Sequence, residues 1–171
     1  VLARETSRED LRRLCSGAPY ETEVFVHGAL CVSQSGGCLF SSLVGGRSGN
    51  RGECAQPCRL PYSLCDAKGA RAGKTRSFPL SLRDLSLAGH VAELIDMGIT
   101  SFKIEGRMKS PEYVRDTAKI WRRLIDENRN ATQAEIAELA GIFSRGGFTD
   151  GYFTGKKDGN MLGIRSEDDK K

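Results

Sequence analysis

The chain alternates between short apolar runs and amphipathic segments, with one long interruption. Apolar residues at helical spacing predict helices at 7–17, 84–98, 110–128 and 132–143. Runs rich in β-branched and aromatic residues predict strands at 21–27, 61–64 and 100–105, with the end of a further buried strand at 1–3. Strand–helix alternation of this kind favours a parallel sheet in an α/β protein.

Capping signals mark where the predicted helices begin. Ser7 precedes two acidic residues, and Ser110 is followed by Pro111, which suits the first helical position. Thr132 and Glu135 have the spacing of a capping box, and Asp84 stands at the start of the second helix. The four helix starts therefore have local chemical support.

Residues 29–60 interrupt the pattern. The segment is rich in Gly and Ser and has little periodicity, and a loop this long is usually functional or is organised by something other than a core. It holds four cysteines spaced C-x6-C-x15-C-x3-C, namely Cys31, Cys38, Cys54 and Cys58. Four soft thiolates suit zinc or an iron–sulfur cluster. The alternative is that two or three of them are small buried hydrophobic residues.

The cysteine spacing does not identify the metal. The C-x2-C pairs of zinc ribbons and the C-x2-C-x2-C run of bacterial ferredoxins are both absent from the sequence. Cys15 and Cys65 stand apart, and we expect both to be ordinary residues. We expect no secretory signal, because the first residues lack a basic-then-apolar pattern; six cysteines then argue against a disulfide framework and for a cytoplasmic protein.

Polar residues follow the predicted strands. His27 ends one strand, and Glu105 and Arg107 follow another. Active residues of barrels gather at the carboxyl ends of strands, although an open doubly wound sheet uses the same position. We expect these three residues to be the catalytic acid–base or substrate-positioning groups. The alternative is a structural histidine and a structural ion pair between Lys103 and Glu105.

Charge adds one candidate interaction. The net charge is +4, and Arg47, Arg51 and Arg59 flank the cysteines. Four thiolates on a cationic core leave negative charge, which these arginines would offset in binding the cofactor. An ordinary solvated surface is the alternative. No apolar run approaches the length of roughly 20 residues that a membrane helix needs, so we expect no membrane association.

Three stretches of the chain resemble peptidase family U32, the collagenase-like proteins. They are EVFVHGALCVSQSGGCLFSSLVGGRSGNRGECAQPCR, LSLRDLSLAGHVAELIDMGITSFKIEGRMKSPEYV and FSRGGFTDGYFTGK. The first is most similar to the bacterial branch that contains a ribosomal RNA cytidine hydroxylase. The resemblance implies that residues 1–155 are the C-terminal half of a modified TIM barrel with a long cysteine-rich insert. Residues 156–171 would then be a tail or linker, and the missing N-terminal half would be a partner, without which the chain should self-associate or be unstable.

The resemblance also implies a cofactor and two competing activities. It implies a 4Fe–4S cluster on the four cysteines, loaded by iron–sulfur assembly machinery, with zinc as the alternative. It implies ribosomal or transfer RNA as substrate and prephenate as a possible co-substrate. The family name implies an endopeptidase, but the sequence holds no G-x-S-x-G or H-E-x-x-H motif. We therefore favour an RNA base hydroxylation factor over an endopeptidase or a non-catalytic metal-stapled module.

Overall fold

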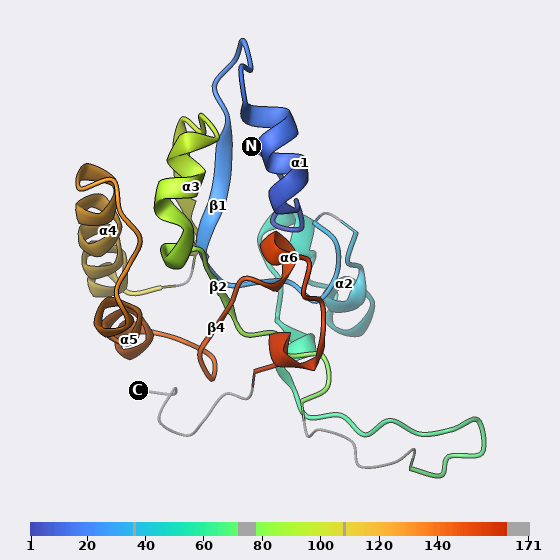
Figure 1. The fold of residues 1–171 in the computed structure, drawn as a ribbon. Coiled ribbons are helices and arrows are strands. Elements are labelled where there is room, and N and C mark those ends of the chain that lie inside the picture. Colours follow the sequence, from blue (N-terminus) through green and yellow to red (C-terminus); the bar gives the residue numbers. More distant parts are fainter. Residues whose placement is uncertain (36, 72–77, 108, 164–171) are drawn as a thin grey trace.

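The computed structural model describes residues 1–35, 37–71, 78–107 and 109–163 (Figure 1). Its strands are β1 (Glu23–Gly28), β2 (Asp84–Ser86), β3 (Ser101–Ile104) and β4 (Phe148–Thr149). Its helices are α1 (Arg8–Cys15), α2 (Phe40–Gly45), α3 (Val91–Asp96), α4 (Pro111–Asp126), α5 (Gln133–Ile142) and α6 (Gly151–Thr154). Short 3₁₀ turns are η1 (Gly49–Arg51), η2 (Pro57–Arg59), η3 (Ala88–His90) and η4 (Gly159–Met161).

The four strands form one mixed sheet in the order β3-β1-β2-β4. The outer pairs, β1 with β3 and β2 with β4, are parallel, as the sequence predicted. The central pair, β1 with β2, is antiparallel, so the prediction of a parallel sheet was wrong there. The cysteine segment leaves β1 and returns the chain to the same end of that strand, which reverses the direction of β2. The protein is thus α/β with a mixed sheet.

Three predicted elements differ in the structure. Residues 84–86 form β2 rather than the first turn of a helix, and the helix begins only after η3. Residues 61–64 form no strand. Val1 to Ala3 also form no strand, although the Leu2 N–H donates to the Glu23 carbonyl at 2.8 Å. Residues 84–86 find strand partners in β1 and β4, whereas residues 61–64 and 1–3 form no sheet ladder.

The core lies between the sheet and the helices beside β1 (Figure 1). Its largest fully buried side chains include Leu11, Leu94, Trp121 and Leu124. Cys15 is also buried there, as expected for an ordinary cysteine. Apolar burial of this kind is the main favourable term in folding.

The predicted helix caps are confirmed. Ser7 accepts a hydrogen bond from the Asp10 N–H, and Ser110 accepts one from the Tyr113 N–H. Thr132 and Glu135 form the reciprocal capping box. Each cap uses neighbours in the sequence, which is why local pattern located it.

Residues 156–163 are not a tail. The Met161 carbonyl accepts a hydrogen bond from Arg83 N–H at 2.8 Å, and the Gly163 N–H donates to Ser81 at 2.9 Å. Met161 is buried in the core. Backbone pairing with the segment before β2 therefore extends the folded unit to residue 163, and residues 164–171 of the predicted tail lie outside the described residues.

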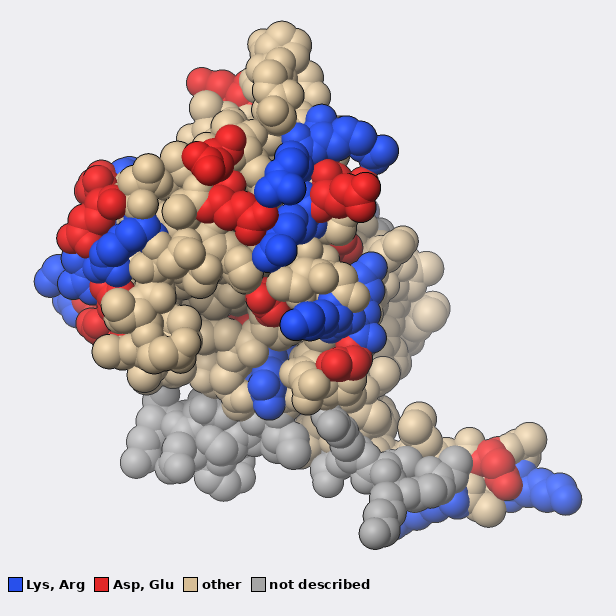
Figure 2. Space-filling model, in the orientation of Figure 1, with Lys and Arg blue, Asp and Glu red and all other residues tan. Residues whose placement is uncertain are grey.

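Charges of both signs are mixed over the face that Figure 2 shows. Glu93 on α3 pairs with Arg8 at 3.3 Å and with Arg12 at 2.9 Å, both on α1. These ion pairs join α1 to α3. Because acidic and basic side chains alternate here, this face has no uniform basic patch. None of the helices within the described ranges has the length and apolar character needed to cross a bilayer.

Candidate functional site

The carboxyl ends of β1 and β3 meet at Gly28 and Glu105. The Glu105 N–H donates to the His27 carbonyl at 2.8 Å. Gly28 has a φ of +109°, and a Cβ placed on it would lie 2.5 Å from the Glu105 carbonyl oxygen. Only glycine tolerates both conditions. This approach places two of the predicted catalytic residues on adjacent backbone at the end of the sheet from which the cysteine segment starts.

The four candidate thiols lie in one neighbourhood. Burial raises the pKa of the Cys58 thiol, and the nearby thiols of Cys31, Cys54 and Cys38 raise it further, against the opposing charge of Arg59. The Gln56 N–H donates to the Cys54 sulfur at 3.3 Å. Four soft donors with an N–H directed at one sulfur fit zinc or a 4Fe–4S cluster in donor chemistry.

The four thiols do not have the geometry of a metal site in this structure. Within the described residues, no group of three His, Cys, Asp or Glu side chains is close enough to hold a metal ion. The metal-ligating role of the cysteines therefore stays a prediction, supported by donor type and proximity. Cys65 is exposed in a separate turn, where its backbone forms an isolated antiparallel β-bridge with Arg71.

The three flanking arginines differ in position. Arg59 donates to the Leu30 carbonyl at 2.5 Å, to Ser81 Oγ at 3.1 Å and to the Leu82 carbonyl, so its guanidinium is directed at the protein. Arg47 and Arg51 are exposed, and neither has a side-chain hydrogen bond or ion pair with another described residue. Those two are available to an anionic ligand.

Glu105 is held on both carboxylate oxygens. Oε2 pairs with Arg4, whose guanidinium lies 4.3 Å from the centre of the Phe25 ring, and Oε1 accepts the Arg107 N–H at 2.9 Å. The predicted alternative of a pair with Lys103 is wrong, because Lys103 pairs with Glu23 at 2.6 Å. The structure thus orients the Glu105 carboxylate with positive charge beside it.

Arg107 reaches the cysteine segment. A Cβ placed on Gly52 would lie 2.8 Å from Arg107 Nη1, so the guanidinium packs against the backbone two residues before Cys54. This contact joins the loop after β3 to the cysteines. It brings Glu105 and Arg107 into the same region as the candidate metal ligands.

His27 is buried among aromatic rings. It is 1% exposed, and its ring centre lies 5.1 Å from Phe148, 6.1 Å from Trp121 and 6.4 Å from Tyr113. Burial, with a smaller contribution from Lys109, lowers the pKa of His27 to about 4. The imidazole is therefore neutral at pH 7 and packs inside the protein rather than on an open surface. Its catalytic role stays a prediction.

Sequence reasoning missed a buried ion pair beside this site. The Asp84 carboxylate accepts the Arg145 backbone N–H at 2.9 Å and also pairs with the Arg145 guanidinium. The two residues are 1% and 7% exposed. Burial, with the Asp84 and Glu105 charges, raises the pKa of Tyr113 to about 12. Asp84 looked like a helix cap, and the only other signal was a pair of charged residues inside the apolar run LSLRDLSLA.

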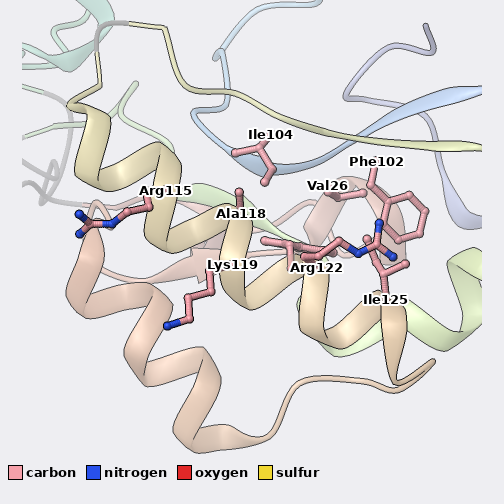
Figure 3. A pocket seen from close by; sticks show the side chains of 9 residues that line it. Val26, Phe102, Ile104, Arg115, Ala118, Lys119, Arg122 and Ile125 are labelled. Carbon is pink, nitrogen blue, oxygen red and sulfur yellow. The ribbon is translucent and has the colours of Figure 1, made fainter.

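An apolar groove of about 450 Å³ lies elsewhere, between α4 and the sheet. Figure 3 shows Val26, Phe102 and Ile104 on its sheet side, with Arg115 and Lys119 of α4 pointing away. None of the predicted site residues lines this groove. The candidate site is therefore defined by the convergence of loops at the strand ends.

Fold and site together define an α/β protein in which a cysteine-rich segment follows strand β1 and contacts the loop after the parallel strand β3. The sequence profile of Peptidase family U32 matches residues 1–163. The chain therefore belongs to peptidase family U32, as the resemblance had predicted.

Curated relatives carry two kinds of name. The chain is 42% identical to "tRNA hydroxylation protein P1" of Bacillus subtilis over 131 residues, which cover 74% of this chain and 31% of that protein. It is 43% identical to "23S rRNA 5-hydroxycytidine C2501 synthase" of Escherichia coli over 126 residues, 74% of this chain and 19% of that protein. It is 36% identical to "Collagenase" of Porphyromonas gingivalis over 175 residues, 92% of this chain and 42% of that protein. The chain thus spans less than half the length of each, and no solved structure matches it significantly.

Proposed function

We propose that this chain is the metal-binding part of an iron–sulfur-dependent RNA base hydroxylation factor. The observation that carries the proposal is the convergence of the four cysteines with Glu105 and Arg107 at one end of the sheet. Two relatives named for tRNA and 23S rRNA hydroxylation support the substrate class. A cytidine-like base in ribosomal or transfer RNA is the proposed target, in the cytoplasm.

Each group has a proposed part. Cys31, Cys38, Cys54 and Cys58 would hold a 4Fe–4S cluster loaded by the iron–sulfur assembly machinery, and the bound cluster would supply electron-transfer chemistry. Arg47 and Arg51 are exposed and would bind backbone phosphates. The same guanidinium groups can pair with the carboxylates of prephenate as a co-substrate.

Glu105 and His27 would have different roles in the reaction. The Glu105 carboxylate, fixed by Arg4 and the Arg107 N–H, is oriented to accept a proton or a hydrogen bond at the strand ends. His27 stays neutral in its aromatic surroundings because burial lowers its pKa to about 4, so it would help to position the substrate as a neutral imidazole rather than carry a charge.

Endopeptidase activity is the second candidate, because the relative named "Collagenase" aligns with 92% of this chain. Against it, the described site offers carboxylate, arginine and thiol groups, and its histidine is 1% exposed and packed among aromatic rings. A metal-stapled module without catalysis is the third candidate.

The test begins with metal content. The protein is purified anaerobically and its iron, sulfide and zinc are measured, beside single Cys→Ser variants at the four positions and Cys65→Ser as the matched control. Stoichiometric iron and sulfide, lost in the four variants but kept in Cys65→Ser, is the expected result. Zinc without iron would point to the metal-stapled module.

Activity is tested separately. Ribosomal and transfer RNA from a deletion strain are mapped by mass spectrometry for a missing hydroxyl group, and complementation with wild-type and Cys→Ser genes follows. An unchanged RNA map would refute the RNA role. Collagen cleavage that persists after iron removal would favour the endopeptidase.

A further inference from the structure

Two hydrogen-bonded links join the candidate ligands in pairs without using any thiol. The first is between Ser41 and Ala55, where the Ala55 N–H donates to Ser41 Oγ at 2.9 Å. Ser41 lies three residues after Cys38 and is 3% exposed, and Ala55 directly follows Cys54. This single bond therefore ties the second cysteine to the third across the long Gly-rich interval.

The second link is made by Arg59, which directly follows Cys58. Its guanidinium donates at 2.5 Å to the carbonyl of Leu30, the residue before Cys31. The other side of the guanidinium donates to Ser81 Oγ at 3.1 Å and to the Leu82 carbonyl. Leu30 and Leu82 are core residues. Arg59 therefore ties the first cysteine to the fourth and anchors both to the packed part of the protein.

We propose that Ser41 and Arg59 are positioning residues that hold the backbone beside the four cysteines in place before any metal arrives. Ser41 pairs Cys38 with Cys54, and Arg59 pairs Cys31 with Cys58. The inference rests on the proposed metal-binding function and extends it to how the site is built. Holding the backbone in place lowers the conformational entropy that metal binding must overcome. The segment then differs from small zinc domains, which unfold without metal.

The first experiment is independent of metal identity. Amide hydrogen exchange is measured at Ala55 in the whole metal-free chain, for wild type, Ser41→Ala and the neighbouring control Ser42→Ala. We expect Ala55 to be protected in wild type and in Ser42→Ala, and its protection to fall about tenfold in Ser41→Ala, the factor for one hydrogen bond of ordinary strength. An unprotected Ala55 amide in the metal-free wild type overturns the proposal, even if a cluster is later found.

The second experiment measures the metal site itself. Iron per chain and the electron paramagnetic resonance spectrum of the reduced protein are compared for Arg59→Lys and for the control Arg13→Lys, which keeps the same charge at an exposed position on α1. Ser41→Ala is compared with Ser41→Thr, which keeps a hydroxyl. We expect lower iron content or altered spectra in Arg59→Lys and Ser41→Ala, with melting temperatures recorded for each variant.

Wild-type iron content and spectra in both of these variants would overturn the positioning role. A chain that binds no metal but keeps Ala55 protected would refute the proposed function while leaving the metal-free scaffold in place. The two failures are therefore distinguishable.

Discussion

The Asp84 carboxylate accepts both the backbone N–H and the guanidinium of Arg145, and the two residues lie 61 positions apart in the chain. This contact joins the start of β2 to the loop before β4. Breaking a buried pair by removing one partner leaves an uncompensated buried charge.

We therefore expect Arg145→Ala to lower the free energy of unfolding by about 3–5 kcal/mol. Chemical denaturation of wild type and variant measures the difference. The control is Arg115→Ala, which removes the exposed Arg115–Asp116 pair and should cost less than about 1 kcal/mol. Equal, small effects of the two substitutions would contradict the importance of the buried pair.

His27 should make stability depend on pH. Its pKa falls from 6.5 to about 4 on folding, so the unfolded chain binds the proton more readily. The contribution of His27 to the free energy of unfolding is constant above pH 6.5. It becomes unfavourable as the pH falls toward 4, by about 3 kcal/mol in total. Unfolding free energies of wild type and His27→Gln, measured from pH 7 to pH 4, should show a shallower slope in the variant. An imidazole that titrates near pH 6.5 in an NMR titration would refute this.

Gly28 should resist substitution. Alanine there would combine a strained positive φ with a Cβ too close to the Glu105 carbonyl, so Gly28→Ala should cost at least about 2 kcal/mol. Gly141 in α5 has open space around its Cβ position, and Gly141→Ala should stabilise the protein by about 0.5–1 kcal/mol. Thermal melts of both variants test the pair, and a neutral Gly28→Ala would contradict the close approach of β1 and β3.

RNA binding should depend on the exposed arginines. We expect Arg47→Ala and Arg51→Ala each to weaken binding to ribosomal RNA fragments and to lower the slope of log K against log salt by about one. Titrations at several salt concentrations measure the slope. Arg13→Ala on α1, where Arg13 pairs with Asp10, is the control and should leave the slope unchanged. Identical slopes in all three variants would argue against phosphate contacts at the cysteine segment.

Local chemistry made much of the fold predictable, and long-range contact made the rest unpredictable. The caps at Ser7, Ser110 and Thr132 use partners three residues away, so pattern sufficed to place α1, α4 and α5. Aspartate is also a common helix cap, but the partner of Asp84 is Arg145, which is distant in sequence. Asp84 therefore begins strand β2 instead of a helix.

The candidate site divides in the same way. Cysteine type and spacing identified the neighbourhood of Cys58, and the strand-end rule identified Glu105 and Arg107. Burial of His27 and the inward direction of Arg59 depend on the packing of Trp121 and Leu82, which lie far along the chain. No local pattern contains that information.

The antiparallel pairing of β1 with β2 has a kinetic consequence. It closes the whole cysteine segment into one loop, so the central strands can pair only after distant parts of the chain have met. Such contacts slow folding, whereas the entropic cost of loop closure grows only slowly with loop length. Extra residues inserted at the exposed turn between Cys65 and Arg71 should therefore change the folding rate and stability little. That turn is a suitable place to attach a spectroscopic probe for following assembly of the cysteine segment.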